Sequence, residues 1–374
     1  MADLGEIVRA VGPEYVQTHR TTPFQRKALR AIGRCRTAAN GTLSAKCENC
    51  GVAYPRFRSC RNRNCPQCQG QARTAWLEAR EREVLAVPYF HVVFTVPKAL
   101  NAIALYCPEV FYKALLQSAG NALLDVGLSK LQARLGVLAI LHTWGQNLSL
   151  HPHVHCVVPG GGFSINGSRW IAVPNPAYLL PIKVLSRRFR TLLCRALRTA
   201  TGAGKLQRLP ENVSPLHAID TAAGQEWITY AKPPFGGPQQ VLEYLSRYTH
   251  RVAISNRRIL SFVDGQVTFR WRDYADSNRV KQSTLTAAEF LRRFLRHVLP
   301  DRFVRIRYFG FFSNRRRAEN IRRARALIGR AEGLRFRTRP KAPLLCPACY
   351  VAASANVPRM LTAKLRSPPL TNAA

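Results

Sequence analysis

The sequence predicts an α+β fold in which helices flank an antiparallel sheet. Short β-rich runs are mixed with helical stretches, and neighbouring runs at 136–158 and 259–271 are close enough to pair as hairpins. Strands joined by tight turns pair antiparallel, which favours this class over a parallel sheet. A cysteine-rich stretch at 41–72 further predicts a small metal-binding module ahead of the sheet.

Local patterns place the elements along the chain. In order they are helices within 1–40, the cysteine-rich stretch 41–72, a helix at 73–86, a strand at 89–96, a helix to about 132, strands at 136–144 and 151–158, a short strand near Trp170, a helix at 184–199, a strand at 226–232, a helix from Pro238 through Tyr248, the hairpin at 259–271, a helix from Thr286 and an arginine-rich stretch at 313–341. Thr22-Pro23 is a helix cap and first turn. Asp264-Gly265 is a strong hairpin signal, and Thr286 with Glu289 forms a capping box.

The composition indicates a polyanionic partner. Lys and Arg number 57 against 20 Asp and Glu, which gives a net charge of +37. Arginine, which suits bidentate phosphate contacts, heavily outnumbers lysine. Nucleic acid is therefore the first candidate partner, and an anionic membrane surface a distant second. The sequence has no apolar run long enough for a spanning helix, and MADLGEIVRAVGPEY lacks the apolar segment of a secretory signal. We expect a cytoplasmic protein whose cysteines are mostly reduced.

The run His151-Pro-His-Val-His155 is the most informative motif. His153 and His155 bracket one apolar residue, so on a strand both imidazoles leave the same face. A strand of this type is the metal-site signature of single-strand nucleases that use a tyrosine nucleophile. The plain alternative is a strand with two ordinary histidines. Because three of the nine histidines fall within five residues, we favour the metal interpretation.

A third ligand for this cation should come from the preceding strand. By alternation His142, Trp144 and Gln146 share one face of that strand. Gln146 or His142 is therefore the candidate, and we prefer Gln146.

Two tyrosines are candidate nucleophiles. Tyr244 and Tyr248 lie four residues apart, on one face of the expected helix. A phenolate can break a phosphodiester if a divalent cation polarises the phosphate. A core aromatic pair has the same spacing, so the spacing alone leaves both interpretations open. The neighbouring Arg247 and Arg251 favour contact with phosphate.

The cysteine-rich stretch predicts one structural zinc site. Cys47-x-x-Cys50 and Cys65-x-x-Cys68 are separated by fourteen residues, and four thiolates at this spacing form a closed tetrahedral site. Cys60, between them, is a spare or an alternative ligand. The arginines around these pairs are candidate DNA contacts, with a solvated face as the alternative: Arg56, Arg58, Arg61 and Arg63. Cys346-x-x-Cys349 lacks a second pair nearby, so its metal binding is left open.

Several runs together resemble one known family. In order they are Ser59–Gln69, Tyr89–Pro97, Leu141–Gln146, His151–His155, Tyr244–Asn256 and Glu289–Pro300. They look like the insertion-sequence-91 group of bacterial rolling-circle transposases, from about residue 10 to about residue 350. The resemblance implies an N-terminal helical and zinc-binding domain at 1–86, an HUH single-strand endonuclease domain with a central antiparallel sheet at 87–312, and an arginine-rich C-terminal region and tail at 313–374.

The resemblance also implies a reaction. Tyrosine attacks DNA, which leaves a 5′-phosphotyrosine link and a free 3′-hydroxyl that can prime replication. The metal pair falls on His153 and His155, and the nucleophiles fall on Tyr244 and Tyr248. The implied cofactors are structural Zn²⁺ and catalytic Mg²⁺ or Mn²⁺. The implied partners are single-stranded or hairpin DNA ends of a mobile element and host replication proteins, in a bacterial, nucleoid-associated setting.

Two departures and two alternatives qualify this interpretation. Asn64 stands where a histidine is expected before the second cysteine pair, and Cys346–Cys349 runs into a short tail. One alternative is a zinc-dependent DNA-binding protein with a decayed catalytic domain, but the presence of both histidines and both tyrosines favours the transposase. A free-standing metal hydrolase would leave the charge and the tyrosine pair unexplained.

Overall fold

The computed structural model describes residues 2–47, 49–232, 253–274 and 276–329, together with Cys346, Cys349, Leu361 and Thr362. Its helices are α1 (Leu4–Thr18), α2 (Pro23–Arg34), α3 (Gln69–Glu81), α4 (Asn101–Tyr106), α5 (Pro108–Leu131), α6 (Ile182–Gly202), α7 (Pro215–Ala223), α9 (Ala287–Leu295) and α10 (Arg317–Ile328). Its strands are β1 (Thr42–Cys47), β2 (Ala53–Phe57), β3 (Tyr89–Thr95), β4 (Ala133–Trp144), β5 (Leu150–Pro159), β6 (Gly161–Ser164), β7 (Trp170–Ala172), β8 (Thr229–Lys232), β9 (Ile259–Val263), β10 (Gln266–Asp273), β11 (Arg279–Thr286), β12 (Ile306–Gly310) and β13 (Leu361–Thr362).

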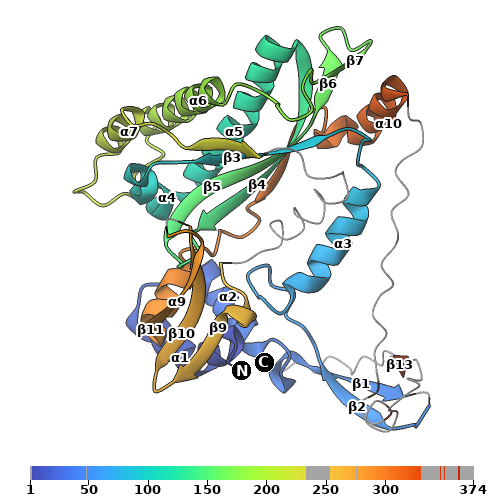
Figure 1. Cartoon of the computed structure of the whole chain (residues 1–374). Coiled ribbons are helices and arrows are strands. Elements are labelled where there is room, and N and C mark those ends of the chain that lie inside the picture. Colours follow the sequence, from blue (N-terminus) through green and yellow to red (C-terminus); the bar gives the residue numbers. More distant parts are fainter. Residues whose placement is uncertain are drawn as a thin grey trace.

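A seven-stranded sheet forms the upper lobe of the molecule (Figure 1). Its order is β7-β6-β4-β5-β3-β8, and β12 also pairs with β4. All of these pairings are antiparallel. The predicted α+β class with an antiparallel sheet is confirmed.

The two faces of this sheet differ in chemistry. Alternate residues such as Val137, Ala139 and Leu141 of β4 enter the main core, and Val154 and Cys156 of β5 do the same. Helices α5 and α6 cover that face (Figure 1). Phe111, Leu115 and Phe189 are among their buried side chains. The intervening residues of β4 and β5 face the other side and include histidines. Part of that second face is covered by α3, whose Trp76 and Leu77 pack against Leu138, Ile140 and Val157.

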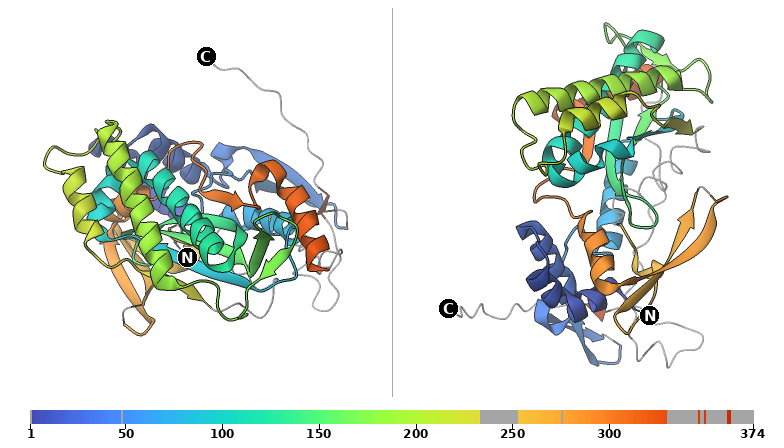
Figure 2. Two further views of the ribbon diagram at one scale, coloured as in Figure 1. Left: turned by 90° about the horizontal axis from the view of Figure 1, so that it is seen from above. Right: turned by 90° about the vertical axis from the view of Figure 1, so that its left-hand side faces the viewer.

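A second core builds the lower lobe. It combines α1 and α2 with α9 and with the three-stranded sheet β9–β11 (Figures 1 and 2). Trp144 and Leu148, from the end of β4 and the turn before β5, are buried in it. The long β4–β5 hairpin therefore runs through the upper sheet and anchors its tip in the lower lobe.

Arginines of α10 show that part of the positive charge has a structural use. The guanidinium of Arg317 lies 4.4 Å from the ring centroid of Tyr308 and 3.3 Å from the carboxylate of Glu83. Arg325 donates to the carbonyl of Arg82 at 2.6 Å. These contacts fasten α10 against β12 and the end of α3. Within the described ranges, no helix combines the length and the apolar character needed to traverse a bilayer.

Candidate functional site

Three histidines gather on the sheet face away from α5. Antiparallel pairing puts His142 of β4 opposite His153 of β5, and His155 opposite Ile140. Residues paired in this way point to the same face, as do residues two apart on one strand. The ring centroids of His142 and His155 are 4.4 Å apart, and those of His153 and His155 are 4.8 Å apart. One ring nitrogen from each of the three lies within 4.8 Å of the others, which is a spacing that suits one cation.

Hydrogen bonds orient two of these rings. His153 Nδ1 lies 2.7 Å from the carbonyl oxygen of His151, which can only accept, so Nδ1 carries the proton. His155 Nδ1 lies 2.8 Å from Nε2 of His91 on β3. In both rings Nδ1 is held by the protein, so the nitrogen that each would offer to a cation is Nε2. This arrangement is usual for histidine ligands of metals.

Burial keeps the His153 and His91 imidazoles neutral. Loss of solvent lowers the pKa of His153 to about 4, from an ordinary value near 6.5. It also lowers the pKa of His91 to about 3, with the charge of Lys232 adding to the effect. Neutral imidazole is the form that binds a cation, so His153 is in its ligand form at neutral pH.

The structure groups His142, the alternative third ligand, with His153 and His155. Gln146 was preferred on the assumption that β4 alternates without interruption, but the β4–β5 register shifts between His142 and Trp144, where β4 ends. Gln146 lies in the turn, and its side-chain amide donates to the hydroxyl of Tyr274 at 3.0 Å. His142, the alternative, completes the cluster and stacks on Trp144 with 4.5 Å between centroids.

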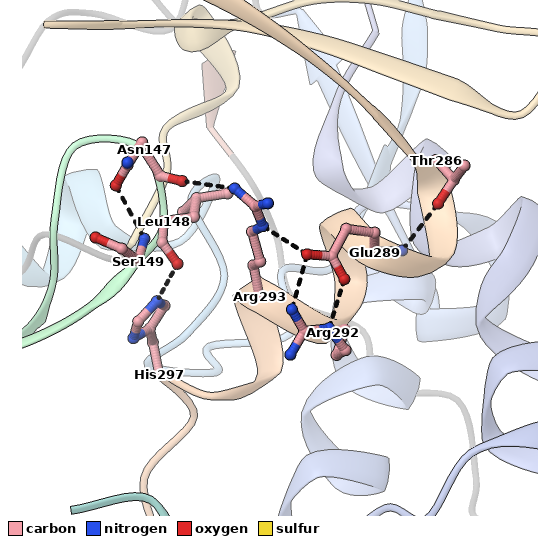
Figure 3. A network of polar contacts seen from close by, with 8 residues as sticks. All are labelled: Asn147, Leu148, Ser149, Thr286, Glu289, Arg292, Arg293 and His297. Carbon is pink, nitrogen blue, oxygen red and sulfur yellow. Dashed lines mark hydrogen bonds and ion pairs between the residues drawn. The ribbon is translucent and has the colours of Figure 1, made fainter. Parts of the chain in front are cut away.

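Helix α9 holds the turn that follows His142 (Figure 3). Arg293 donates to the carboxylate of Glu289 at 2.7 Å and to the carbonyl of Asn147 at 3.5 Å. His297 Nε2 lies 3.2 Å from the carbonyl of Leu148. The lower lobe thus fixes the end of the hairpin that carries the histidines.

The predicted single zinc site is wrong in its grouping. The thiols of Cys65 and Cys68 gather with those of Cys35 and Cys60, and all four lie within 4.8 Å of one another. Cys68 Sγ is 3.5 Å from Cys35 Sγ and 3.6 Å from Cys60 Sγ. Cys35 follows α2, so the fold of the N-terminal helices brings it to the pair at 65–68. Cys60, expected as a spare or an alternative ligand, is one of the four cysteines of this cluster.

The other predicted pair has different partners. Cys47, at the end of β1, and Cys50 lie beside Cys346 and Cys349, again within 4.8 Å. The chain therefore brings together two four-cysteine clusters.

The four arginines that were predicted to contact DNA fall into two groups in the structure. Arg56, Arg58 and Arg61 are exposed. Arg63 instead donates to the carbonyls of Phe303, Leu299 and Pro300 at 2.6, 2.9 and 2.5 Å. Burial lowers the pKa of Arg63, although it stays charged. Its guanidinium is committed to the backbone after α9, so its predicted role as a DNA contact is corrected.

The proposed nucleophiles lie outside the described residues. This applies to Tyr244 and Tyr248, and to Arg247 and Arg251. The described residues that flank this segment are Lys232 and Ala253. Lys232 pairs with His91 in the sheet register, and Ala253 packs in the same core as Trp144.

Besides Cys60, Cys346 and Cys349, three site residues were missed or undervalued in the sequence: His91, Cys35 and His142. His91 lies two residues before Val93 on β3, so both side chains leave the same face of the strand. Val93 pairs with His155, which puts His91 on the face of the histidine cluster. The position of His91 within a β-rich run was visible in the sequence. Cys35 stands alone in sequence, twelve residues before Cys47, so spacing did not identify it. His142 was considered but ranked second because the break in β4 leaves no mark in the sequence.

Comparison with known proteins is consistent with this geometry. Residues 136–320 match the family described as "Putative transposase", and residues 7–96 match the one described as "Transposase zinc-binding domain". The chain is 46% identical over 336 residues to "Putative transposase y4qJ" of Sinorhizobium fredii (strain NBRC 101917 / NGR234), which covers 87% of this chain and 84% of that protein. It is 28% identical over 286 residues to "Transposase for insertion sequence element IS801" of Pseudomonas savastanoi pv. phaseolicola, with 75% and 68% covered.

Among solved structures, the chain is similar to the conjugative relaxase TrwC in complex with oriT DNA, at 13% identity and a TM-score of 0.23. The superposition covers 43% of this chain and 71% of that one. Because it is partial, the family assignment comes from the sequence relatives.

Proposed function

The chain belongs to the insertion-sequence-91 group of transposases, and we propose that it cuts and rejoins single-stranded DNA through a tyrosine–DNA intermediate. The observation that carries this proposal is the cluster of His142, His153 and His155 on one face of the upper sheet, with two rings oriented through Nδ1. Three imidazoles fill half of an octahedral shell and leave positions for phosphate oxygens.

The donor set fits a divalent cation of moderate softness. Mg²⁺ prefers oxygen ligands, so of the two expected cations Mn²⁺ suits three nitrogens better. When bound, the cation would withdraw charge from a non-bridging oxygen of the scissile phosphate. The protein's own contribution is to hold the rings in place, with His153 neutral at pH 7.

We propose Tyr244 and Tyr248 as the nucleophiles. The phenolate oxygen of one tyrosine forms a bond to phosphorus, and the bond from phosphorus to the 3′ oxygen breaks. That oxygen leaves with a proton as a free 3′-hydroxyl, while the 5′ phosphate stays on the tyrosine. One phosphodiester bond replaces another, so the reverse attack by a hydroxyl can rejoin DNA without an energy source. Lys232, which bounds the segment that carries both tyrosines, pairs with His91, and His91 contacts His155; this supports the assignment.

Electrostatics supports DNA as the partner. With a net charge of +37, binding should release many counterions and weaken steeply with salt. We propose single-stranded or hairpin ends as the bound form, because a phenolate must reach an unpaired backbone.

A covalent-adduct assay tests the proposal. A labelled single-stranded oligonucleotide from the element's ends is incubated with protein and Mn²⁺ or Mg²⁺, and protein–DNA adducts are separated under denaturing conditions. We expect adduct with the natural protein and none with Tyr244→Phe, Tyr248→Phe combined. His153→Ala, His155→Ala should lose the adduct yet retain most DNA binding. His217→Ala, an exposed position on α7, is the control.

Two outcomes would contradict the proposal. Adduct formation that survives loss of both hydroxyls would move the nucleophile elsewhere, with Tyr230 and Tyr308 the first to test. DNA binding without any adduct under either cation would instead match a decayed, DNA-binding derivative of such an element.

A further inference from the structure

We propose that Cys47, Cys50, Cys346 and Cys349 form a second structural zinc site, which clasps the C-terminal region onto the β1–β2 hairpin. The matched zinc-binding domain spans residues 7–96 and so contains only two of these four cysteines. This inference stands apart from the nuclease proposal, because none of its residues touches the histidine cluster.

The distances between the sulfurs fit a tetrathiolate site. Cys47 Sγ lies 3.8 Å from Cys349 Sγ, and Cys50 Sγ lies 3.6 Å from Cys346 Sγ. Zinc–sulfur bonds of about 2.3 Å in a tetrahedron separate the sulfurs by about 3.8 Å. A disulfide would instead need sulfurs about 2.05 Å apart. The four thiols are thus arranged around a shared centre rather than as two bonded pairs.

Backbone hydrogen bonds of Cys47 with Gly51 and Val52 close a tight turn, as in zinc knuckles. The amide of Gly51 donates to the Cys47 carbonyl at 3.0 Å, and the amide of Cys47 donates to the Val52 carbonyl at 2.9 Å. Gly51 has a φ of +70°, a conformation that residues with a side chain rarely adopt. This tight turn directs both thiols to the same side.

Polar neighbours complete the surroundings of the sulfurs. The side-chain amide of Asn49 donates to Cys349 Sγ at 3.5 Å, and Cys346 Sγ lies 3.4 Å from the hydroxyl of Tyr54. Hydrogen bonds of this kind stabilise the thiolate form that binds zinc.

Strand pairing supplies an independent sign that the two ends of the chain meet. β13 pairs antiparallel with β1, with Thr362 opposite Lys46 and Leu361 opposite Cys47 (Figure 1). Among the described residues, the apolar cluster here consists of Cys47 and Cys346 with Tyr54 and Cys349 packed on them. So small a cluster supplies little hydrophobic stabilisation, and a metal ion is the usual substitute in such modules.

The zinc content of the full chain tests whether this second zinc site exists. All proteins carry His153→Ala, His155→Ala, so that the histidine cluster adds nothing to the count, and are purified under reducing conditions. The parent should hold two zinc ions per chain. Cys346→Ser, Cys349→Ser should hold one, Cys65→Ser, Cys68→Ser should hold one, and the control Cys194→Ala, on α6, should hold two.

Two further measurements separate zinc binding from a merely structural thiol cluster. Cys349→His supplies another zinc ligand and should keep two ions, which a packing role would not require. In Cys346→Ser, Cys349→Ser, amide hydrogen exchange should speed up in β1 while β4 and β5 stay protected. Two zinc ions in that serine variant, one ion in the parent, or two disulfides in the intact mass of the parent would overturn the proposal.

Discussion

His91 and His155 face each other across β3 and β5, with His91 Nε2 2.8 Å from His155 Nδ1 and their rings only 8° from parallel. The contact orients His155 so that its other nitrogen turns toward His142 and His153. His91 is thus a positioning residue, which would act on the cation through its neighbour. Removal of such a partner typically weakens metal affinity about 10- to 100-fold.

We therefore expect His91→Phe to weaken Mn²⁺ binding by about that factor, because the flat ring fills the space without the hydrogen bond. His91→Gln keeps a polar partner and should recover part of the affinity. Calorimetric titration with Mn²⁺ measures the effect, and nicking at saturating Mn²⁺ should return toward the natural rate. Unchanged affinity in His91→Phe would show that the contact does not tune the site.

The identity of the third ligand gives a second prediction. His142→Ala should reduce Mn²⁺ affinity strongly, because it removes one of three imidazoles. Gln146→Ala loses only the 3.0 Å contact with Tyr274 and should leave the affinity close to that of the natural protein. The same titration decides between them, and the reverse order of effects would restore the assignment made from the sequence.

The upper sheet could be predicted because its signals are local. The His153–His155 spacing, the β-rich run of β3 and the alternation along β4 each fix which side chains share a face. Gln146 was preferred on the assumption that side chains keep alternating between the two faces beyond His142. The alternation is interrupted by the register shift between His142 and Trp144, which depends on how the turn packs into the lower lobe.

The cysteine partners could not be read from spacing. A Cys-x-x-Cys pair identifies half of a site, but its complement depends on where distant segments meet. Cys47 and Cys349 are 302 residues apart, and only the fold brings them together. Arg63 is a similar case, since nothing local distinguishes it from the exposed Arg61.

That difference between Arg61 and Arg63 gives a third prediction. Arg63→Ala leaves three backbone carbonyls without their charged donor and should lower the free energy of unfolding by about 1.5 to 3 kcal/mol. Arg61→Ala should cost less than about 0.5 kcal/mol. Urea denaturation compares the two variants.

DNA binding should show the opposite pattern. If Arg61 contacts a phosphate, its loss should reduce the slope of log affinity against log salt by about 1, whereas Arg63→Ala should leave that slope unchanged. A lower slope for Arg63→Ala in a folded protein would contradict the structural role given to it.

Acid should destabilise the protein through His297. Its Nε2 donates to the Leu148 carbonyl, so Nδ1 accepts from the hydroxyl of Thr143 at 3.1 Å. Burial lowers its pKa to about 4, against an ordinary value near 6.5. Between these two pKa values His297 is protonated in the unfolded chain and neutral in the folded chain. The contribution of His297 to the free energy of unfolding is therefore complete above about pH 6.5 and decreases as the pH drops toward 4. The loss from this one group should approach roughly 3 kcal/mol.

His297→Gln isolates the contribution of His297, because other buried histidines also lower stability in acid. Glutamine can donate to the Leu148 carbonyl and accept from Thr143, but it does not titrate. Urea midpoints measured from pH 7.5 to pH 4.5 should therefore fall less steeply for His297→Gln than for the natural protein. The curve for His217→Gln, at an exposed position, should overlay that of the natural protein. Equal slopes for His297→Gln and the natural protein would mean that His297 is protonated in the folded state. It would then donate from both nitrogens, and Thr143 would have to act as its acceptor.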